Sequence, residues 1–201
     1  MNKGIPHNFR LLACAVPACA SVSALAGNIC FEAESARKIA PPMEVVRKAE
    51  DGPDAAKNPA LKGASASCYI RIPEGAGNPP KVKKGEAVYS FEVSRPGVYF
   101  LWCRVWWPDE CANSFTISVD GNPAFSFGGD ATYKRWHWVS APPTVKRVQL
   151  EAGKHVLRIK NREDGAAIDQ ILLAEAGRYV PVGREHETGH IRPAEDKEKA
   201  D

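Results

Sequence analysis

Three carboxylates in two distant segments have the residue types and spacing to hold a cation. Glu32 and Glu34 lie in "CFEAES", and Asp169 lies in "NREDGAAIDQILL". Side chains two residues apart on a strand share a face, where like charges repel unless a cation or a proton lies between them. Three carboxylates with backbone carbonyls suit Ca²⁺. A calcium site follows if the two segments are neighbours. Otherwise the glutamates lie on a solvated strand face and Asp169 makes an ordinary turn bond.

Aromatic residues indicate a second kind of chemistry. Proteins bind the flat CH faces of sugars with aromatic platforms, and sugar hydroxyls with polar side chains. The strand expected at "VYFLWCRVWW" has Trp102, Arg104 and Trp106 on one face. Its other face carries Tyr99, Leu101, Cys103, Val105 and Trp107. If that second face is core, the first lies on the outer surface of a sheet, beneath a loop or a ligand.

The elements that position these residues are short strands. Period-two alternation recurs between turn signals such as "RPG" and "DG", and no segment has a good helical period. The expected strands are "CFEAES", "SCYIRIP", "EAVYSFEV", "VYFLWCRVWW", "SFTISVDG", "AFSF", "WHWV", "VKRVQL", "HVLRIKNR" and "IDQILLAE". The pattern predicts an all-β, antiparallel sandwich or jelly roll, whose first and last strands often lie side by side.

The chain divides into three parts. Residues 1–26 read as a signal peptide, with Lys3 and Arg10 before an apolar run too short to span a membrane and "ALA" as the cleavage site. Residues 27–182 form the expected domain, with a surface loop at 36–64 that includes a short strand at "MEVVR". Residues 183–201 are charged and are expected to form a disordered tail. The leader predicts a secreted protein, extracellular or periplasmic.

Charge and cysteine content narrow the function classes. The chain has 27 basic and 24 acidic residues, two of the basic ones in the leader, so no strong field favours nucleic acid. Four cysteines follow the leader, namely Cys30, Cys68, Cys103 and Cys111. An even number in an exported protein predicts two disulfides of unspecified pairing, with buried thiols as the alternative.

One literal enzyme motif occurs. "HETGH", at 186–190, matches the H-E-x-x-H zinc pattern, which needs both histidines on one face of a helix. Gly189 weakens a helix, Pro193 follows closely, and no third ligand is evident. No P-loop or G-x-S-x-G sequence is present, and no pair of carboxylates is marked as a glycosidase acid and base. We therefore expect a protein that is not an enzyme.

The order of several motifs resembles carbohydrate-binding modules of families 6 and 35, which are galactose-binding-domain-like β-sandwiches. "FEAES", "PGVYFLWCRVW", "FTISVDG", "LEAGKHVLRI" and "REDGAAIDQILL" follow one another over roughly residues 29–175. The resemblance implies a structural Ca²⁺ on Glu32, Glu34 and Asp169. It also implies a glycan site in a loop-end cleft, formed here by "WWPDECANS", "DATYKRWHW" and "NREDGAA". The candidate ligand-binding residues are Trp107, Asp109, Tyr133, Trp136, Trp138, Arg162, Glu163 and Asp164.

One position departs from the resembled pattern. These families often carry a sugar-binding asparagine two residues before the calcium aspartate, and Ala167 stands there. Arg162, Glu163 or Asp164 would have to replace it, and Arg162 would favour an acidic glycan. The alternatives are that Trp136 and Trp138 are core residues, that "RED" is a salt-bridged hairpin, and that the domain is a protein-interaction or envelope module without sugar binding.

Overall fold

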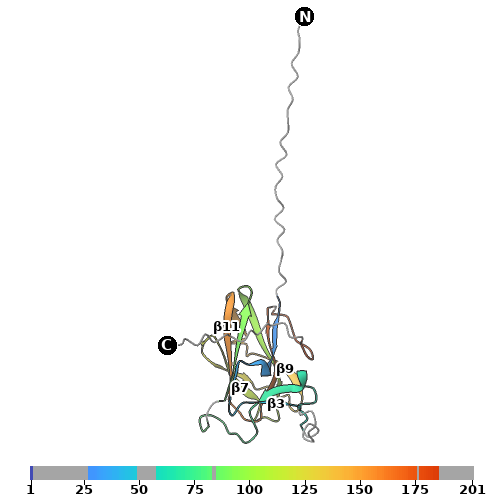
Figure 1. Cartoon of the computed structure of the whole chain (residues 1–201), viewed down its shortest axis with the longest axis vertical. Coiled ribbons are helices and arrows are strands. Elements are labelled where there is room, and N and C mark those ends of the chain that lie inside the picture. The colour runs from blue at the N-terminus through green and yellow to red at the C-terminus, as the bar shows by residue number, and fades with distance from the viewer. Residues whose placement is uncertain (2–26, 49–57, 83–84, 176, 186–201) are drawn as a thin grey trace, which may run out of the picture.

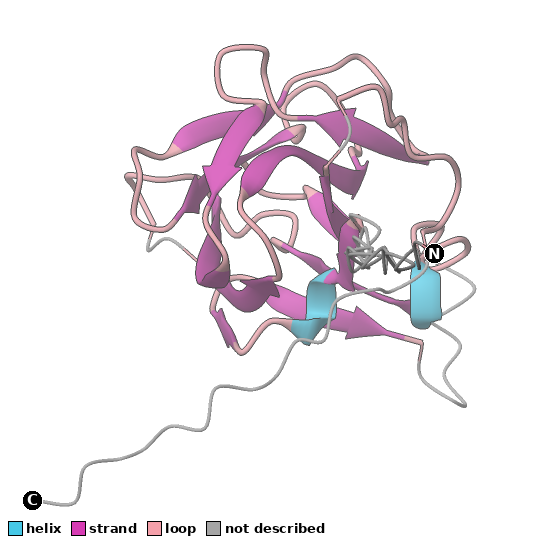
Figure 2. Cartoon of the chain, turned by 90° about the horizontal axis from the view of Figure 1, so that it is seen from above, coloured by secondary structure: helices cyan, strands magenta, loops and turns pink. Residues whose placement is uncertain are grey.

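A computed structural model describes residues 1, 27–48, 58–82, 85–175 and 177–185 as a two-layered β-structure (Figures 1 and 2). Short turn-punctuated strands dominate, as the sequence predicts, and the described helices are two single 3₁₀ turns. The elements are β1 Ile29–Glu32, η1 Ala33–Ser35, β2 Lys38–Ala40, β3 Glu44–Arg47, η2 Ser65–Ser67, β4 Cys68–Arg71, β5 Glu86–Val93, β6 Gly97–Trp106, β7 Ser114–Val119, β8 Phe125–Gly128, β9 Trp136–Ser140, β10 Arg147–Leu150, β11 Gly153–Asn161 and β12 Ala167–Ala174.

Two antiparallel sheets make up the sandwich. The first has the order β10-β6-β12-β4-β3, with β1 paired to β12 and β9 paired to β6. The second has the order β2-β5-β11-β7-β8. In Figure 1, β11 and β7 of the second sheet lie opposite β9 and β3 of the first. The all-β sandwich predicted from the alternating pattern is confirmed.

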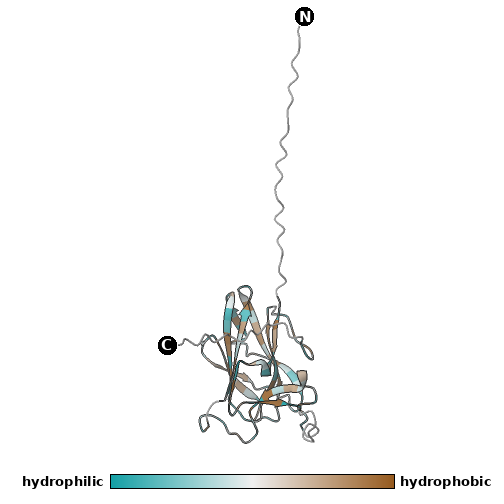
Figure 3. Cartoon of the chain, in the orientation of Figure 1, coloured by the Kyte–Doolittle hydropathy of each residue, from teal (hydrophilic) through white to brown (hydrophobic). Residues whose placement is uncertain are grey.

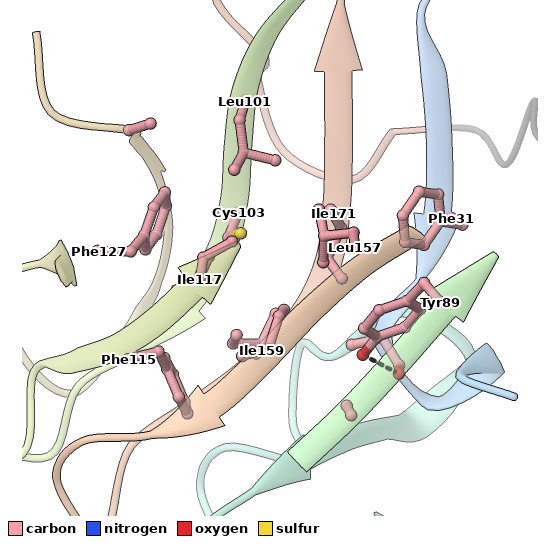
Figure 4. Packing of buried hydrophobic residues seen from close by; sticks show 14 of the residues in the cluster. Phe31, Tyr89, Leu101, Cys103, Phe115, Ile117, Phe127, Leu157, Ile159 and Ile171 are labelled. Atoms are coloured by element: carbon pink, nitrogen blue, oxygen red, sulfur yellow. Dashed lines mark hydrogen bonds between the residues drawn. The ribbon is translucent and has the colours of Figure 1, made fainter. Parts of the chain in front are cut away.

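The core lies between the sheets and is built from alternate residues of each strand. Strand β6 contributes Leu101, Cys103 and Val105, and β11 contributes Leu157 and Ile159, all fully buried. Figure 4 shows Leu101 and Cys103 packed near Leu157 and Ile159. Figure 3 shows apolar and polar residues interleaved along the strands. Period-two alternation produces this pattern because successive side chains point to opposite faces. The expected core face of β6 is therefore confirmed.

The two chain ends of the sandwich meet, as expected. Strand β1 pairs with β12 over four residues, with Glu32 opposite Gln170. The expected strand at "CFEAES" stops at Glu32, however, and Glu34 lies in the 3₁₀ turn η1. The two glutamates therefore do not share a strand face, because the turn redirects the second one. The 36–64 region holds the expected strand as β3, and also β2, which the sequence did not indicate.

No disulfide links Cys30, Cys68, Cys103 or Cys111, so the prediction of two disulfides is wrong for this structure. The reason is the direction of the side chains. Cys103 faces the core between the sheets, whereas Cys30 packs with Leu172 in a cluster on the outer face of the first sheet. Burial raises the pKa of the Cys68 thiol to about 11, which keeps that group protonated at neutral pH.

The chain stays packed beyond the expected domain boundary at residue 182. Glu185 donates its N–H to Gln170 Oε1 at 3.0 Å, and its carbonyl accepts from Gln170 Nε2 at 2.9 Å. Residues 183–185 therefore belong to the folded unit rather than to a tail. The predicted leader and "HETGH" lie outside the described residues. Within the described ranges, no helix has the length and apolar character needed to cross a bilayer.

Candidate functional site

A β-bulge in β12 places Asp169 at the centre of a buried polar cluster. The register of β12 against β6 shifts between Ile168 and Gln170, so Asp169 leaves the regular alternation. Its Oδ1 accepts from Ser65 N at 2.8 Å and lies 2.8 Å from Ser65 Oγ, and its Oδ2 pairs with Arg104. Burial raises the pKa of Asp169 even though Arg104 and Ser65 favour the charged form.

The two glutamates border this cluster. Glu32 Oε1 accepts from Gln170 Nε2 at 2.8 Å, and Glu32 Oε2 lies in contact with Ser65 Oγ. The single proton of that hydroxyl can be donated to Glu32 or to Asp169, but not to both. One carboxylate oxygen of Glu34 is buried without a hydrogen-bond partner among the described residues. Burial raises the pKa of Glu34, and the charges of Glu32 and Asp169 add to the effect. The three carboxylates predicted from the sequence thus lie near one another.

Their suitability for a metal rests on Glu34. In the described ranges, no group of three or more His, Cys, Asp or Glu side chains is arranged as a metal-ligand set. Asp169 accepts from Ser65 N and pairs with Arg104, and Glu32 Oε1 accepts from Gln170. Glu32 Oε2 shares the Ser65 hydroxyl with Asp169, and the buried oxygen of Glu34 has no hydrogen-bond partner among the described residues. An orphaned buried carboxylate oxygen beside two other acids is chemically suited to a hard cation.

The outer face of the first sheet carries four of the five tryptophans. Trp106 and Trp136 are directly opposed in the β6–β9 ladder, with ring centroids 5.8 Å apart, and Arg104 lies over the Trp136 ring at 5.5 Å. The loop before η2 covers this pair, since Trp136 Nε1 donates to Ala60 O at 2.6 Å. The prediction that a loop or ligand covers this face is confirmed for a loop of the same chain.

The C-terminal segment, residues 177–185, covers the rest of this face. Trp138 Nε1 donates to Gly183 O at 2.9 Å, and Trp102, Trp138 and Tyr179 pack around Cys30 and Leu172. Gly177 lies against the Phe100 ring so closely that an added Cβ would be 2.6 Å from it. Trp138 is therefore half-buried beneath the C-terminal segment. The charged composition of residues 183–201 did not indicate this contact.

Two of the predicted site residues, Trp107 and Tyr133, face the protein interior at the loop end. Trp107 is fully buried, and its Nε1 donates to Asp130 Oδ1 at 2.7 Å, which ties the loop after β6 to the loop after β8. Tyr133 is half-buried against the main core. Trp107 is not available to a ligand in this structure.

The remaining predicted residues gather at the same end, and several have structural partners. Glu163 accepts from Asn113 N at 3.0 Å, Asp164 accepts from Gly77 N at 2.9 Å, and Asp109 accepts from Cys111 N at 2.8 Å. Arg162 donates to Ser114 Oγ at 2.5 Å and pairs with Glu163, while 48% of its side chain stays exposed. The salt bridge foreseen in the alternative for "RED" is present, but the segment connects the two sheets rather than forming a hairpin, and Arg162 and Asp109 remain open to solvent.

No model of a known protein family matches the chain, and no curated protein matches it. Among solved structures, it is similar to a GH26-CBM35 β-(1,4)-mannanase of Podospora anserina, with a TM-score of 0.51 and 18% identity over 78% of this chain and 29% of that one. It is also similar to an exo-β-1,3-galactanase of Phanerochaete chrysosporium, with a TM-score of 0.51 and 16% identity over 74% of this chain and 29% of that one.

A family 35 carbohydrate-binding module of Clostridium thermocellum is similar as well, with a TM-score of 0.48 and 19% identity over 72% of this chain and 97% of that one. The chain spans less than a third of the mannanase and of the galactanase. At such identities the likeness to the mannanase and to the galactanase shows the fold alone. The expected likeness to family 35 modules agrees with the first of these, whose name includes CBM35.

Proposed function

We propose that the protein is a non-catalytic glycan-binding module. The observation that carries this proposal is the likeness in fold to the Podospora anserina protein, whose name joins a mannanase to a family 35 carbohydrate-binding module. The present chain spans 29% of that whole protein. Exposed polar groups at the loop end, on Asp109 and Arg162, supply partners for sugar hydroxyls. Affinity is expected to be modest, because a shallow site desolvates little surface.

A second candidate is an interaction domain of the same fold without a sugar site. Ala167 is buried with Ala60, Ala64 and Tyr69, so the position of the usual sugar-binding asparagine is covered by the loop before η2. Trp136 also uses its indole N–H within the protein. These two observations favour a partner other than a sugar, or a sugar bound elsewhere on the surface.

Calorimetric titration separates the two candidates. The wild-type chain is titrated with manno- and galacto-oligosaccharides, beside Arg162→Ala and Asp109→Ala at the loop end and Lys154→Ala on the second sheet as a matched exposed control. We expect weak binding by the wild type and by Lys154→Ala, and a loss of roughly three-fold or more in the loop variants. Binding that is unchanged in folded loop variants would move the site away from the loop end.

We also propose that Ca²⁺ stabilises the module at Glu32, Glu34 and Asp169. The ion would supply positive charge to three neighbouring carboxylates and would leave no buried oxygen of Glu34 without a partner. It would tie β1 and η1 to β12, near the point where the two ends of the sandwich meet. Its role would be structural, because nothing in the proposed function calls for chemistry at the metal.

The expected outcome is a melting temperature that falls in EDTA and recovers with added Ca²⁺. An ion that binds only the folded state at about 100 times its dissociation constant adds about 2.7 kcal/mol to the free energy of unfolding. Glu34→Gln should abolish the response, and Glu110→Gln, an exposed acid in the loop after β6, should keep it. Superimposable melts with and without Ca²⁺ would refute the calcium proposal and leave the glycan proposal standing.

A further inference from the structure

A pocket of about 680 Å³ opens beside β3, the edge strand of the first sheet. Its lining comes from Lys48, which directly follows β3, from the loop 58–64, from the turn at η2, and from Arg184 of the C-terminal segment. The pocket shares no residue with the loop end. Its volume falls in the range of small-molecule sites, which is about 300–1,000 Å³.

The charged residues among the described lining of this pocket are all basic. Lys48, Lys62 and Arg184 line it, and none of its described lining residues is acidic. The structure shows no ion pair for these three cations among the described residues, and Arg184 Nε donates only to a backbone carbonyl, that of Gly63, at 3.3 Å. Glu185, the residue after Arg184, uses its carboxylate elsewhere, since it accepts from Tyr179 at 2.7 Å. Three exposed cations around a concavity attract an anion.

The lining also includes apolar residues and a hydroxyl that a sugar ring could contact. Pro59 and Leu61 are apolar, and Ser67 carries the hydroxyl. An exposed guanidinium can pair with a carboxylate or a sulfate in bidentate fashion, and the two ammonium groups can contact the remaining oxygens. At the loop end, in contrast, Arg162 is already paired with Glu163, so that end offers no comparable excess of positive charge.

We propose that this pocket binds the carboxylate or sulfate group of an acidic glycan, a role that rests on the proposed glycan-binding function. The three cations select the charged residue of the chain, and the apolar residues contact the face of its ring. Binding therefore weakens as salt rises, because dissolved ions screen exposed charges and shorten the Debye length, which is about 10 Å at 0.1 M.

Calorimetry on the whole chain tests this site. The probes are an oligoglucuronate, the same oligosaccharide with its carboxylates methyl-esterified, and a sulfated galacto-oligosaccharide of equal length. We expect the ester to lose nearly all binding, while the two charged probes show which oxyanion is preferred. Replacing Lys48, Lys62 or Arg184 singly with alanine should weaken binding roughly two- to five-fold, and the triple replacement should abolish it.

Lys154→Ala, which removes an exposed cation from β11 on the other sheet, is the matched control and should bind as the wild type does. The esterified probe tests the charge requirement without any substitution, so a variant that fails to fold does not decide the outcome. Equal binding of acid and ester, or wild-type affinity in the folded triple variant, would overturn this site. Binding of neutral glycans alone would also overturn this site but would leave the proposed glycan-binding function intact. If no glycan binds, both the site and the proposed function are wrong.

Discussion

At the residue scale, His155 shows how a single side chain can link two connections, the turn between β7 and β8 and the segment that joins β10 to β11. Its Nδ1 lies 2.6 Å from Asp120 Oδ2, and its Nε2 lies 2.8 Å from Glu151 O. Its ring packs on Phe91 at a centroid distance of 5.5 Å. Burial disfavours the imidazolium, but the bonds to Asp120 and Glu151 outweigh it and raise the pKa of His155. Both ring nitrogens can donate only in the protonated form.

A raised folded-state pKa makes the contribution of His155 depend on pH. The stabilisation is complete below the ordinary histidine pKa of about 6.5 and is lost as pH rises through the folded-state value. Chemical denaturation should show that His155→Gln costs on the order of 1 kcal/mol more near pH 5.5 than near pH 8.5. Asp120 is partly exposed, which limits the effect. An equal cost at both pH values would contradict this assignment.

At the element scale, the C-terminal segment acts as a cover for the outer face of the first sheet. It contributes Tyr179 to the cluster of Trp102 and Trp138, and Gln170 fixes its end through two bonds to the backbone of Glu185. Burial of aromatic surface on this face is worth on the order of 2 kcal/mol. The module therefore needs its chain through residue 185 for full stability.

Truncation after Glu175 tests this cover. Loss of residues 177–185 should expose Trp102 and Trp138 to water, shift tryptophan emission to longer wavelength and lower the free energy of unfolding by about 2 kcal/mol. Truncation after Glu185 is the matched control and should leave both the emission and the stability unchanged. A chain ending at Glu175 with wild-type emission would show that the segment does not cover these rings.

Local patterns allowed prediction of the elements but not of their long-range polar contacts. The alternation in "VYFLWCRVWW" fixes which face of β6 is core, because burial follows the pleat. The bulge that turns Asp169 toward Ser65 and Arg104 joins residues far apart in sequence and leaves no period to detect. Likewise, cysteine count alone could not show that Cys30 and Cys103 face opposite sides of one sheet.

At the scale of the whole molecule, two regions could meet a glycan. The loop end offers exposed polar groups with balanced charge, and the pocket beside β3 offers three cations. The carboxylate cluster of Glu32, Glu34 and Asp169 would secure the junction of β1, η1 and β12 rather than contact the ligand. This division assigns recognition to loops and stability to the sandwich, as is common when function lies on a rigid β-scaffold.

The most direct test of the central claim is a glycan array probed with the whole folded chain in Ca²⁺-containing buffer, with reducing-sugar release measured on every glycan that it binds. We predict binding to a limited set of glycans, with acidic members among them and no release of reducing sugar. Hydrolysis of a bound glycan would contradict the non-catalytic role. Absence of binding across the array, for protein whose circular dichroism shows intact β-structure, would contradict glycan recognition itself and favour the interaction domain.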